Sequence, residues 1–231
     1  MSRSQAWNSK LGIIVKKNLA EGISISDEMM LWVYIAHVRA GGQLADQEWG
    51  PFILSLPDES PCPLSWDEDF LQKHLGGTTV LEHVKREMSV MKEEYRQLCD
   101  ALSAGNEVTV MEWDDIRWAN GMCRSRCFPG PELCGKDCKD ESVLLPLLDM
   151  FNHRFGQAIE WRQTGGGIEF VSVGAKKKGD ELFSNYGPKK NWELLFMHGF
   201  CLEDNDFDTV TASDMPTLSS LFSGLGQTVV F

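Results

Sequence analysis

The sequence predicts an α+β fold in which helices dominate the first half and short strands the second. From Val80 to Leu102, apolar residues recur every three or four positions, which places them along one face of a long helix. After residue 143, short apolar or alternating runs are separated by glycine-containing turns, which is typical of strands. Hydrophobic residues make up 42% of the 231 positions, so the chain can bury a sizeable core.

Capping residues predict where the helices begin and end. Ser26 or Asp27 is the expected N-cap of a helix that ends at Gly41–Gly42. A short helix covers residues 67–74, and the long helix begins at Thr78 or Thr79 and ends at Gly105. A further helix covers residues 113–128, with a buried face formed by Ile116, Ala119, Met122 and Cys123.

Strand signals lie near both ends of the chain. Ile13–Val15 reads as a short strand, and Glu160–Val173 reads as a hairpin that turns at Gly165–Gly167. A phosphate-binding loop is the alternative for this triple glycine, but no helix follows it. Residues 181–186 form the last expected strand. A helix with Asn191, Leu194, Leu195 and His198 on one face follows, and Gly199 is its expected C-cap.

Charge and hydropathy exclude several classes of protein. The formal net charge of −12 argues against nucleic-acid binding, because phosphate groups need a basic surface. The acidic surface either attracts a basic peptide or only keeps the protein soluble. No apolar run approaches the roughly 18 residues of a membrane span, and the N-terminus lacks the apolar stretch of a signal peptide. We expect a cytoplasmic or nuclear protein without membrane partners.

The seven cysteines fit free thiols in a reducing compartment better than a disulfide framework, because their number is odd. Cys123, Cys127, Cys134 and Cys138 have the spacing C-x3-C-x6-C-x3-C, which suggests zinc as an alternative. That spacing differs from the usual C-x2-C pair, and Cys123 is expected to pack as a small hydrophobe. We therefore expect no metal.

Two segments carry the strongest functional signal. Residues 143–153 (VLLPLLDMFNH) form an apolar run that ends in Asp149, Asn152 and His153. Buried polar groups without partners cost about 1–3 kcal/mol each, so these side chains should be hydrogen-bonded or belong to a site. Residues 179–200 (GDELFSNYGPKKNWELLFMHGF) combine a strand, a Gly-Pro break and a helix.

These two segments, in this order, resemble the C-terminal half of a SET domain, the protein-lysine methyltransferase fold. They resemble most closely the branch typified by the Rubisco large-subunit methyltransferase, whose members carry a helical insertion. Residues 118–128 (WANGMCRSRCF) and 47–66 (QEWGPFILSLPDESPCPLSW) are similar to two further motifs of this branch. The resemblance implies a SET-domain β-fold made of small sheets, with a pseudoknot between the Asn-His strand and the tyrosine segment, plus an inserted helical subdomain.

The resemblance also implies domain boundaries. Residues 1–27 correspond to part of the N-terminal SET segment, residues 28–111 to the helical insertion, and residues 112–203 to the C-terminal SET segment. Residues 204–231 form a tail in which the family's substrate-binding domain would begin. At the N-terminus, Gly12 alone matches the family's Gly-x-Gly strand, and a block of family positions has no counterpart. A divergent protein, an altered gene model and a fragment are all consistent with this gap.

The resemblance implies S-adenosylmethionine as methyl donor and a lysine of a protein substrate as acceptor. Tyr186 is then the catalytic residue, because a phenol can hydrogen-bond the attacking amine. The implied cofactor contacts are Arg126, Asp149, Phe151, Asn152, His153, Gly199 and Phe200. Arg126 suits a carboxylate, which its planar fork can hold through two hydrogen bonds. His198 stands where the family has a tyrosine.

Each of these residues also has a purely structural interpretation. Without the motifs, Arg126 would be a surface arginine, Tyr186 a core or turn tyrosine, and His153 a satisfied core histidine whose implied role is through its backbone. Three functions follow: an active lysine methyltransferase, a SET-like protein-binding module without catalysis, and a histidine methyltransferase. The intact motifs favour the first function, and the N-terminal departures favour the second. The oligomeric state has no signal in the sequence.

Overall fold

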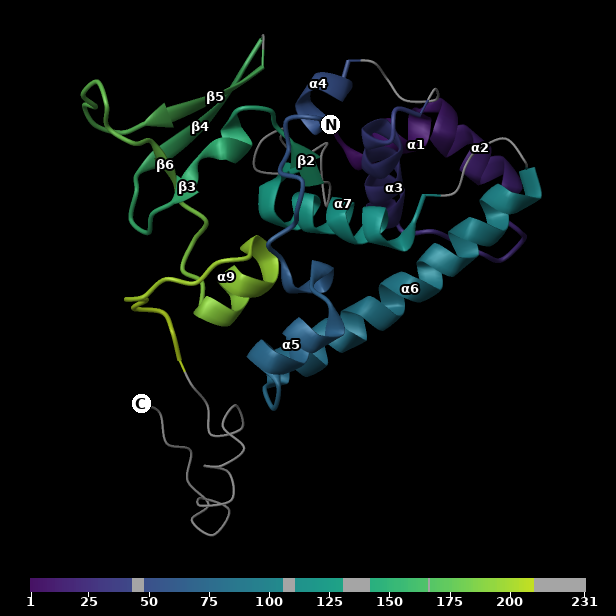
Figure 1. Cartoon of the computed structure of the whole chain (residues 1–231). Coiled ribbons are helices and arrows are strands. Elements are labelled where there is room, and N and C mark those ends of the chain that lie inside the picture. The colour runs from purple at the N-terminus through teal and green to yellow at the C-terminus, as the bar shows by residue number, and fades with distance from the viewer. Residues whose placement is uncertain (43–47, 106–110, 131–141, 166, 210–231) are drawn as a thin grey trace.

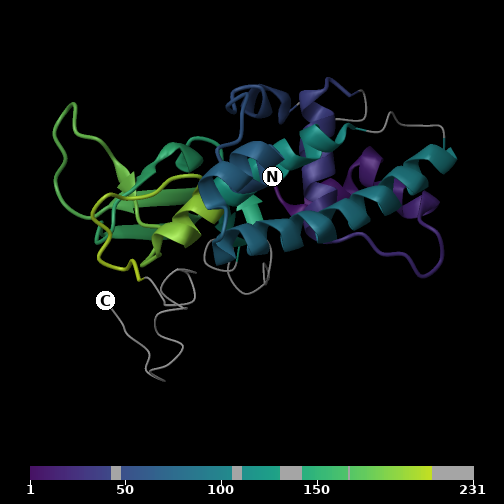
Figure 2. The same ribbon diagram turned by 60° about the horizontal axis from the view of Figure 1, so that its bottom comes forward.

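The computed structural model describes residues 1–42, 48–105, 111–130, 142–165 and 167–209. Helices α1 to α7 form one part of the molecule, and the strands β3 to β6 form the other, with α9 between them (Figure 1). In a second view the β4–β5 hairpin and the α1–α2 pair again lie at opposite ends (Figure 2). This arrangement is the α+β architecture that the sequence predicts.

The N-terminal strand prediction is wrong. Residues 3–18 form two helices, α1 (Arg3–Asn8) and α2 (Lys10–Asn18). The Ser9 hydroxyl accepts the Gly12 N–H at 3.0 Å and so caps α2. Leu11 and Val15 are four positions apart and both buried, whereas Ile13 is 57% exposed, which is a helical pattern. Gly12 serves packing here, because a Cβ atom at this position would lie 2.4 Å from the Ala6 carbonyl oxygen.

The helix predictions from residue 26 onward are confirmed. Helix α3 (Asp27–Arg39) begins at Ser26, whose hydroxyl accepts the Met29 N–H at 3.1 Å. Helix α5 spans Glu68–Leu75, and the 27-residue helix α6 spans Thr79–Gly105. Thr78 caps α6, since its hydroxyl accepts the Leu81 N–H at 3.3 Å. The short helices α4 (Gly50–Ile53) and η1 (Pro63–Ser65) connect α3 to α5.

Helix α7 (Trp113–Arg126) buries the predicted face and delivers Arg126 to its C-terminal end. It packs on α3, η1 and α9. Gly121 permits a close approach to the preceding loop, because a Cβ atom there would lie 1.8 Å from the Ser60 hydroxyl oxygen. The loop that holds Pro57 and Pro61 is thereby held against the same helix, and the Trp118 indole donates to the Pro57 carbonyl at 2.9 Å.

Within the described ranges, the strands form three separate two-stranded sheets. Strand β1 (Cys127–Pro129) pairs antiparallel with β2 (Ser142–Leu144), and β4 (Ile159–Thr164) pairs antiparallel with β5 (Gly167–Ser172) as the predicted hairpin. Strand β3 (Asn152–His153) pairs parallel with β6 (Phe183–Ser184). This last pairing lays the Asn-His segment beside the tyrosine segment, although the two are some thirty residues apart in sequence. The 3₁₀ helix η3 (Leu148–Met150) precedes β3.

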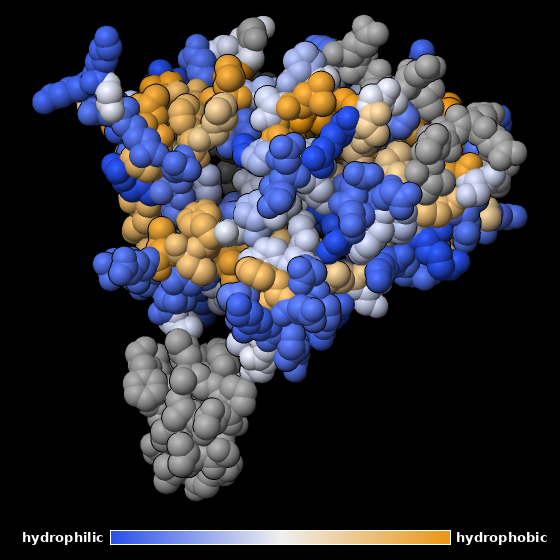
Figure 3. Space-filling model, in the orientation of Figure 1, coloured by the Kyte–Doolittle hydropathy of each residue, from blue (hydrophilic) through white to orange (hydrophobic). Residues whose placement is uncertain are grey.

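Helix α9 (Asn191–His198) ends at Gly199 in the left-handed conformation, with φ of 79°, as predicted. In the space-filling view, hydrophilic residues cover much of the helical part, while apolar residues gather over the end formed by the hairpin (Figure 3). None of the helices in the described ranges is both long and apolar enough to cross a bilayer. Cys134, Cys138 and residues 210–231 lie outside the described residues, so the zinc question and the tail stay predictions.

Candidate active site

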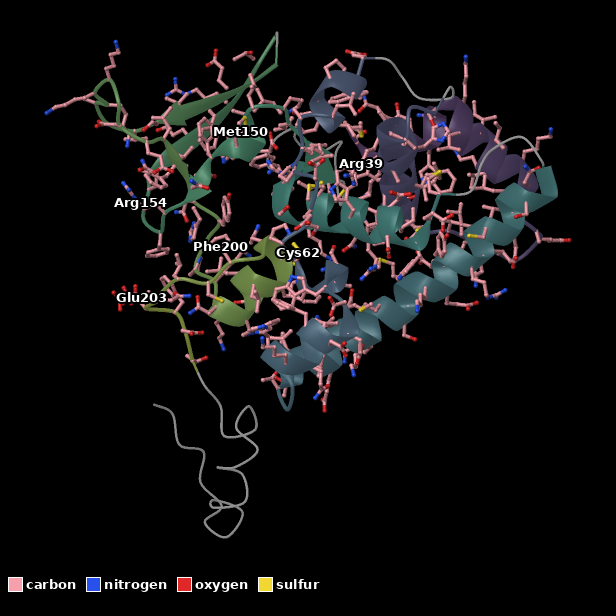
Figure 4. The ribbon with its side chains drawn as sticks, viewed as in Figure 1. Arg39, Cys62, Met150, Arg154, Phe200 and Glu203 are labelled. Carbon is pink, nitrogen blue, oxygen red and sulfur yellow. The ribbon has the colours of Figure 1, made fainter. Side chains whose placement is uncertain are left out.

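Two cavities meet at Tyr186. We call them the Asn152 cavity, with a volume of about 270 Å³, and the Trp161 cavity, of about 470 Å³. Met150 and Phe200, which both line the first cavity, are labelled in Figure 4. The residues that line both cavities are Ser125, Arg126, Asp149, Tyr186 and His198. The Asn152 cavity is further lined by Pro57, Pro61, Met122, Met150, Phe151, Asn152 and Phe200.

Tyr186 is fixed by hydrogen bonds at both its side chain and its backbone. Its hydroxyl donates to the Phe151 carbonyl oxygen at 2.7 Å, and its N–H donates to His153 Nδ1 at 3.1 Å. Burial raises the pKa of the phenol above its usual value. The hydroxyl therefore stays protonated at neutral pH, and its hydrogen is already committed to Phe151.

Two imidazole rings contact the Tyr186 ring. The His153 ring stacks on it at a centroid distance of 5.0 Å and an angle of 18°, and the His198 ring lies at 4.6 Å and 34°. Phe200 approaches the edge of the same group, 6.4 Å from the Tyr186 ring. Offset and edge contacts of this kind stabilise aromatic clusters beyond their apolar burial, so they restrict the orientation of the phenol.

Arg126 and Asp149 form a buried ion pair in the wall shared by the two cavities. Arg126 Nη1 lies 2.7 Å from Asp149 Oδ2 and 3.4 Å from the Asp149 carbonyl oxygen. The Asp149 side chain is 1% exposed and that of Arg126 is 21% exposed. Asp149 Oδ1 is buried and has no hydrogen-bond partner among the described residues. A buried carboxylate oxygen without a donor is costly, so this atom is a local source of instability.

Asn152 and His153 differ in how they are used. The Asn152 amide nitrogen donates to Glu181 Oε1 at 2.7 Å, across the β3–β6 pair. The sequence assigned His153 a role mainly through its backbone, but its imidazole accepts the Tyr186 N–H. Burial, together with the nearby Lys189 charge, lowers the pKa of His153. A neutral ring keeps Nδ1 available as the acceptor that this hydrogen bond needs.

Gly199 shapes the course of the backbone after α9 and does not line either cavity. Its φ of 79° favours glycine, and a Cβ atom at this position would lie 2.5 Å from Pro61 Cβ. The glycine therefore lets the chain turn tightly after α9 and places Phe200 against the Asn152 cavity. The structure thus brings Arg126, Asp149, Phe151, Asn152, Tyr186 and Phe200 together around one cavity, with His153 and Gly199 supporting them.

Sequence reasoning missed the aromatic wall of the Trp161 cavity. The Phe128 and Trp161 rings contact edge to face at 5.2 Å, and Trp161 contacts Phe170 at 4.4 Å. The sequence placed Trp161 in a hairpin and gave Phe128 only as part of a motif. No local signal could have joined them, because the contact depends on how the hairpin folds over the end of α7.

His198 is the second residue that the sequence noted without giving it a role. It is half-buried, and desolvation lowers the pKa of its ring to about 4, with smaller contributions from the Lys189 and His153 charges. A hydrogen bond with the Ser125 backbone opposes this shift. Its Nδ1 is buried without a hydrogen-bond partner among the described residues.

Curated proteins that are similar in sequence to this chain are methyltransferases. The chain is 36% identical over 168 residues to ribosomal lysine N-methyltransferase set10 of Schizosaccharomyces pombe, covering 71% of this chain and 30% of that protein. It is 40% identical over 94 residues to ribosomal lysine N-methyltransferase 1 of Saccharomyces cerevisiae, covering 40% of this chain and 16% of that protein. It is also 27% identical over 169 residues to the actin-histidine N-methyltransferase of Danio rerio, covering 70% of this chain and 28% of that protein.

Solved structures agree with these relatives. The SET domain of LSMT bound to lysine and AdoHcy matches all of this chain and 53% of its own, with a TM-score of 0.67 and 20% identity. Rubisco LSMT bound to sinefungin and monomethyllysine gives the same values. No protein-family model matches the chain. The chain spans less than half the length of the curated relatives that it matches and about half of the solved structures.

The fold and the arrangement around Tyr186 define the class: this is a SET-domain fold with helices inserted beside small sheets. The chain is thus similar to SET-domain lysine methyltransferases in sequence and has the fold of the LSMT SET domain.

Proposed function

We propose that this chain is an S-adenosylmethionine-dependent protein-lysine N-methyltransferase. The cofactor occupies the Asn152 cavity, and the target lysine side chain enters the Trp161 cavity. The single observation that carries this proposal is that the two cavities share one wall at Tyr186. Methyl transfer needs two reactants to meet in line at roughly 3 Å with water excluded, and two cavities joined at one polar residue allow such an approach.

The residues of the Asn152 cavity fit the amino-acid end of the cofactor. Asp149 lines the cavity, and its carboxylate would attract an α-ammonium group. Arg126 makes its recorded hydrogen bonds through Nη1, so its remaining donors suit an α-carboxylate. Phe200 and Pro61 offer an apolar surface to an adenine ring. When bound, the cofactor supplies an electrophilic methyl group on a sulfonium sulfur.

The Trp161 cavity fits a lysine side chain. Phe128 and Trp161 give it an aromatic wall, which suits both the alkyl stem and the cationic head of a lysine. A formal net charge of −12 favours the approach of a basic protein segment and disfavours nucleic acid. The partner we infer is therefore a protein with an accessible lysine.

Tyr186 orients the amine in this proposal. A free lysine has a pKa near 10.4, and a dry, partly apolar cavity favours its neutral form, which alone can attack. The Tyr186 hydroxyl gives its hydrogen to Phe151, so its lone pairs accept an N–H of the amine. His153 and His198 both contact the ring and restrict its orientation. The amine lone pair is thereby directed away from Tyr186 and toward the neighbouring cavity.

Free thiols and the composition lead us to propose a cytoplasmic or nuclear location. The described cysteines that are recorded as free are Cys62, Cys99, Cys123, Cys127 and Cys201. Free thiols on this scale fit a reducing compartment.

The test is transfer of labelled methyl groups from S-adenosylmethionine to a lysine-rich protein extract, followed by amino-acid analysis of the product. Methyllysine supports the proposal. Methylhistidine as the sole product would favour the histidine alternative, which the actin-histidine relative makes specific. Cofactor binding without any labelled product over a range of extracts would favour a protein-binding module.

A further inference from the structure

We propose that a third cavity, between the N-terminal ends of α6 and α9, binds a small organic anion in which a phosphate group is joined to an aromatic ring. We call it the Arg86 cavity. Its volume is about 510 Å³, which suits a small molecule. It shares no lining residue with the two cavities at Tyr186, which meet the opposite end of α9 at His198. The inference therefore goes beyond methyl transfer.

Two cationic side chains line the Arg86 cavity without a carboxylate partner among the described residues. Arg86 stands four positions after Glu82, which is the spacing of a helical ion pair, yet its guanidinium turns to another group. Its Nη2 donates to His83 Nδ1 at 2.5 Å, because an arginine cannot accept a hydrogen bond. The Lys190 ammonium group forms no ion pair within the described ranges. Both positive charges are therefore available to a ligand.

Two carboxylates also line the cavity, and neither pairs with these cations. Both oxygens of Asp208 are occupied: Oδ1 accepts the Asn191 N–H at 3.1 Å, and Oδ2 accepts the Asn191 side-chain amide at 2.9 Å. Glu82 is exposed, so its side chain can turn toward water. An anion in this cavity therefore meets Arg86 and Lys190, while Glu82 opposes its binding.

Trp192 gives the cavity an aromatic wall. This residue is 42% exposed, and its ring meets the His83 ring edge to face at 6.2 Å. A flat ring placed on the indole removes apolar surface of both partners from water, which is favourable. The guanidinium fork of Arg86 matches two oxygens of a phosphate group, and Lys190 adds a point charge. One aromatic phosphate can satisfy the indole and both cations.

The experiment measures binding of phenyl phosphate by calorimetry at low ionic strength, where screening of the charges is weakest. The wild-type chain should bind it with a Kd below about 1 mM, and phenol and inorganic phosphate should each bind at least tenfold more weakly. Saturation with S-adenosylhomocysteine should leave this binding unchanged, since the cavities share no residue. AMP and phosphotyrosine, titrated in turn, distinguish a nucleotide from a phosphorylated amino acid as the source of this chemistry.

Three variants and a matched control test the charges. Arg86→Gln and Lys190→Gln should each weaken phenyl phosphate binding about tenfold or more, because each removes one positive charge. Glu82→Gln should strengthen it several-fold, because it removes the opposing charge. Arg96→Gln is the control: Arg96 also lies on α6, but it is paired with Glu93 at 2.8 Å and is outside the cavity. It should bind as wild type, and circular dichroism shows whether each variant is folded.

The Trp192 indole reports where the ligand lies. Its N–H resonance, assigned by its absence from the spectrum of Trp192→Phe, should shift on addition of phenyl phosphate, whereas that of Trp161 in the other cavity should not. The inference is overturned if the wild type does not bind phenyl phosphate or binds inorganic phosphate equally well. It is also overturned if Arg96→Gln weakens binding as much as Arg86→Gln, or if S-adenosylhomocysteine displaces the ligand. None of these outcomes bears on the proposed methyl transfer.

Discussion

Replacing Arg126 with methionine should destabilise the protein strongly, because it leaves a buried carboxylate without its partner. Arg126 Nη1 lies 2.7 Å from Asp149 Oδ2, and the Asp149 side chain is only 1% exposed. Removing one member of a buried pair typically costs about 3–5 kcal/mol. For a chain of this length, each kcal/mol lowers Tm by roughly 2–4 °C, so Arg126→Met should lose about 6–20 °C.

The reverse change should cost less. Asp149→Leu leaves Arg126 behind, but the arginine side chain is 21% exposed and can turn toward water. The double variant Arg126→Met/Asp149→Leu should recover most of the loss, because no buried charge remains. The free energy of unfolding is measured by urea denaturation for all four members of the cycle.

A matched control separates burial from distance. The Arg162–Glu160 pair has the same 2.7 Å separation, but both side chains are more than half exposed. Arg162→Met should therefore leave Tm essentially unchanged. The reasoning is refuted if Arg126→Met loses no more stability than Arg162→Met, or if the double variant is no more stable than Arg126→Met.

Three other predictions concern the same site. His198 has a pKa of about 4 in the folded state and about 6.5 in the unfolded state. Its contribution to the free energy of unfolding is therefore complete above pH 6.5 and is lost as the pH falls from 6.5 toward 4. Between pH 7 and pH 5 the protein should lose about 2 kcal/mol of stability in urea titrations, and His198→Gln should lack this loss. Gly199→Ala should destabilise the protein by about 2 kcal/mol or more, because the position has φ of 79° and the new Cβ atom would clash with Pro61. Gly156→Ala should cost only the backbone strain, because this position has φ of 73° but open space around it. Thermal unfolding compares the two variants. Asn152→Ala should weaken S-adenosylmethionine binding about tenfold by calorimetry, and an unchanged affinity in the folded variant would remove Asn152 from the site.

The sequence predicted those elements whose signals are local. The cap at Ser26, the apolar stripe of α6 and the left-handed Gly199 each depend on residues within a few positions, and all three are confirmed. Ile13–Val15 was assigned to a strand because this short stretch is rich in β-branched residues. The helical spacing of Leu11 and Val15 was the stronger physical signal, since it decides which side chains are buried.

The site itself was predictable in its residues but not in its contacts. Motif resemblance selected the residues around the Asn152 cavity, yet the hydrogen bond from the Tyr186 N–H to the His153 imidazole depends on the parallel pairing of β3 and β6. Trp161 reaches Phe128 only through the folded hairpin. Such long-range contacts leave no periodic trace in the sequence, so the structure was needed to find them.

The most direct test of the account is the rate of methyl transfer by Tyr186→Phe. This change removes the hydroxyl that donates to Phe151 at 2.7 Å but keeps the ring and its contacts with the two imidazoles. Folding and S-adenosylmethionine affinity should stay within a few-fold of wild type. Methyl transfer should fall by roughly 10²-fold or more, because one well-placed polar contact in a dry site contributes about 2.7–4 kcal/mol to the transition state. Equal rates and equal products for wild type and Tyr186→Phe would show that Tyr186 does not orient the amine.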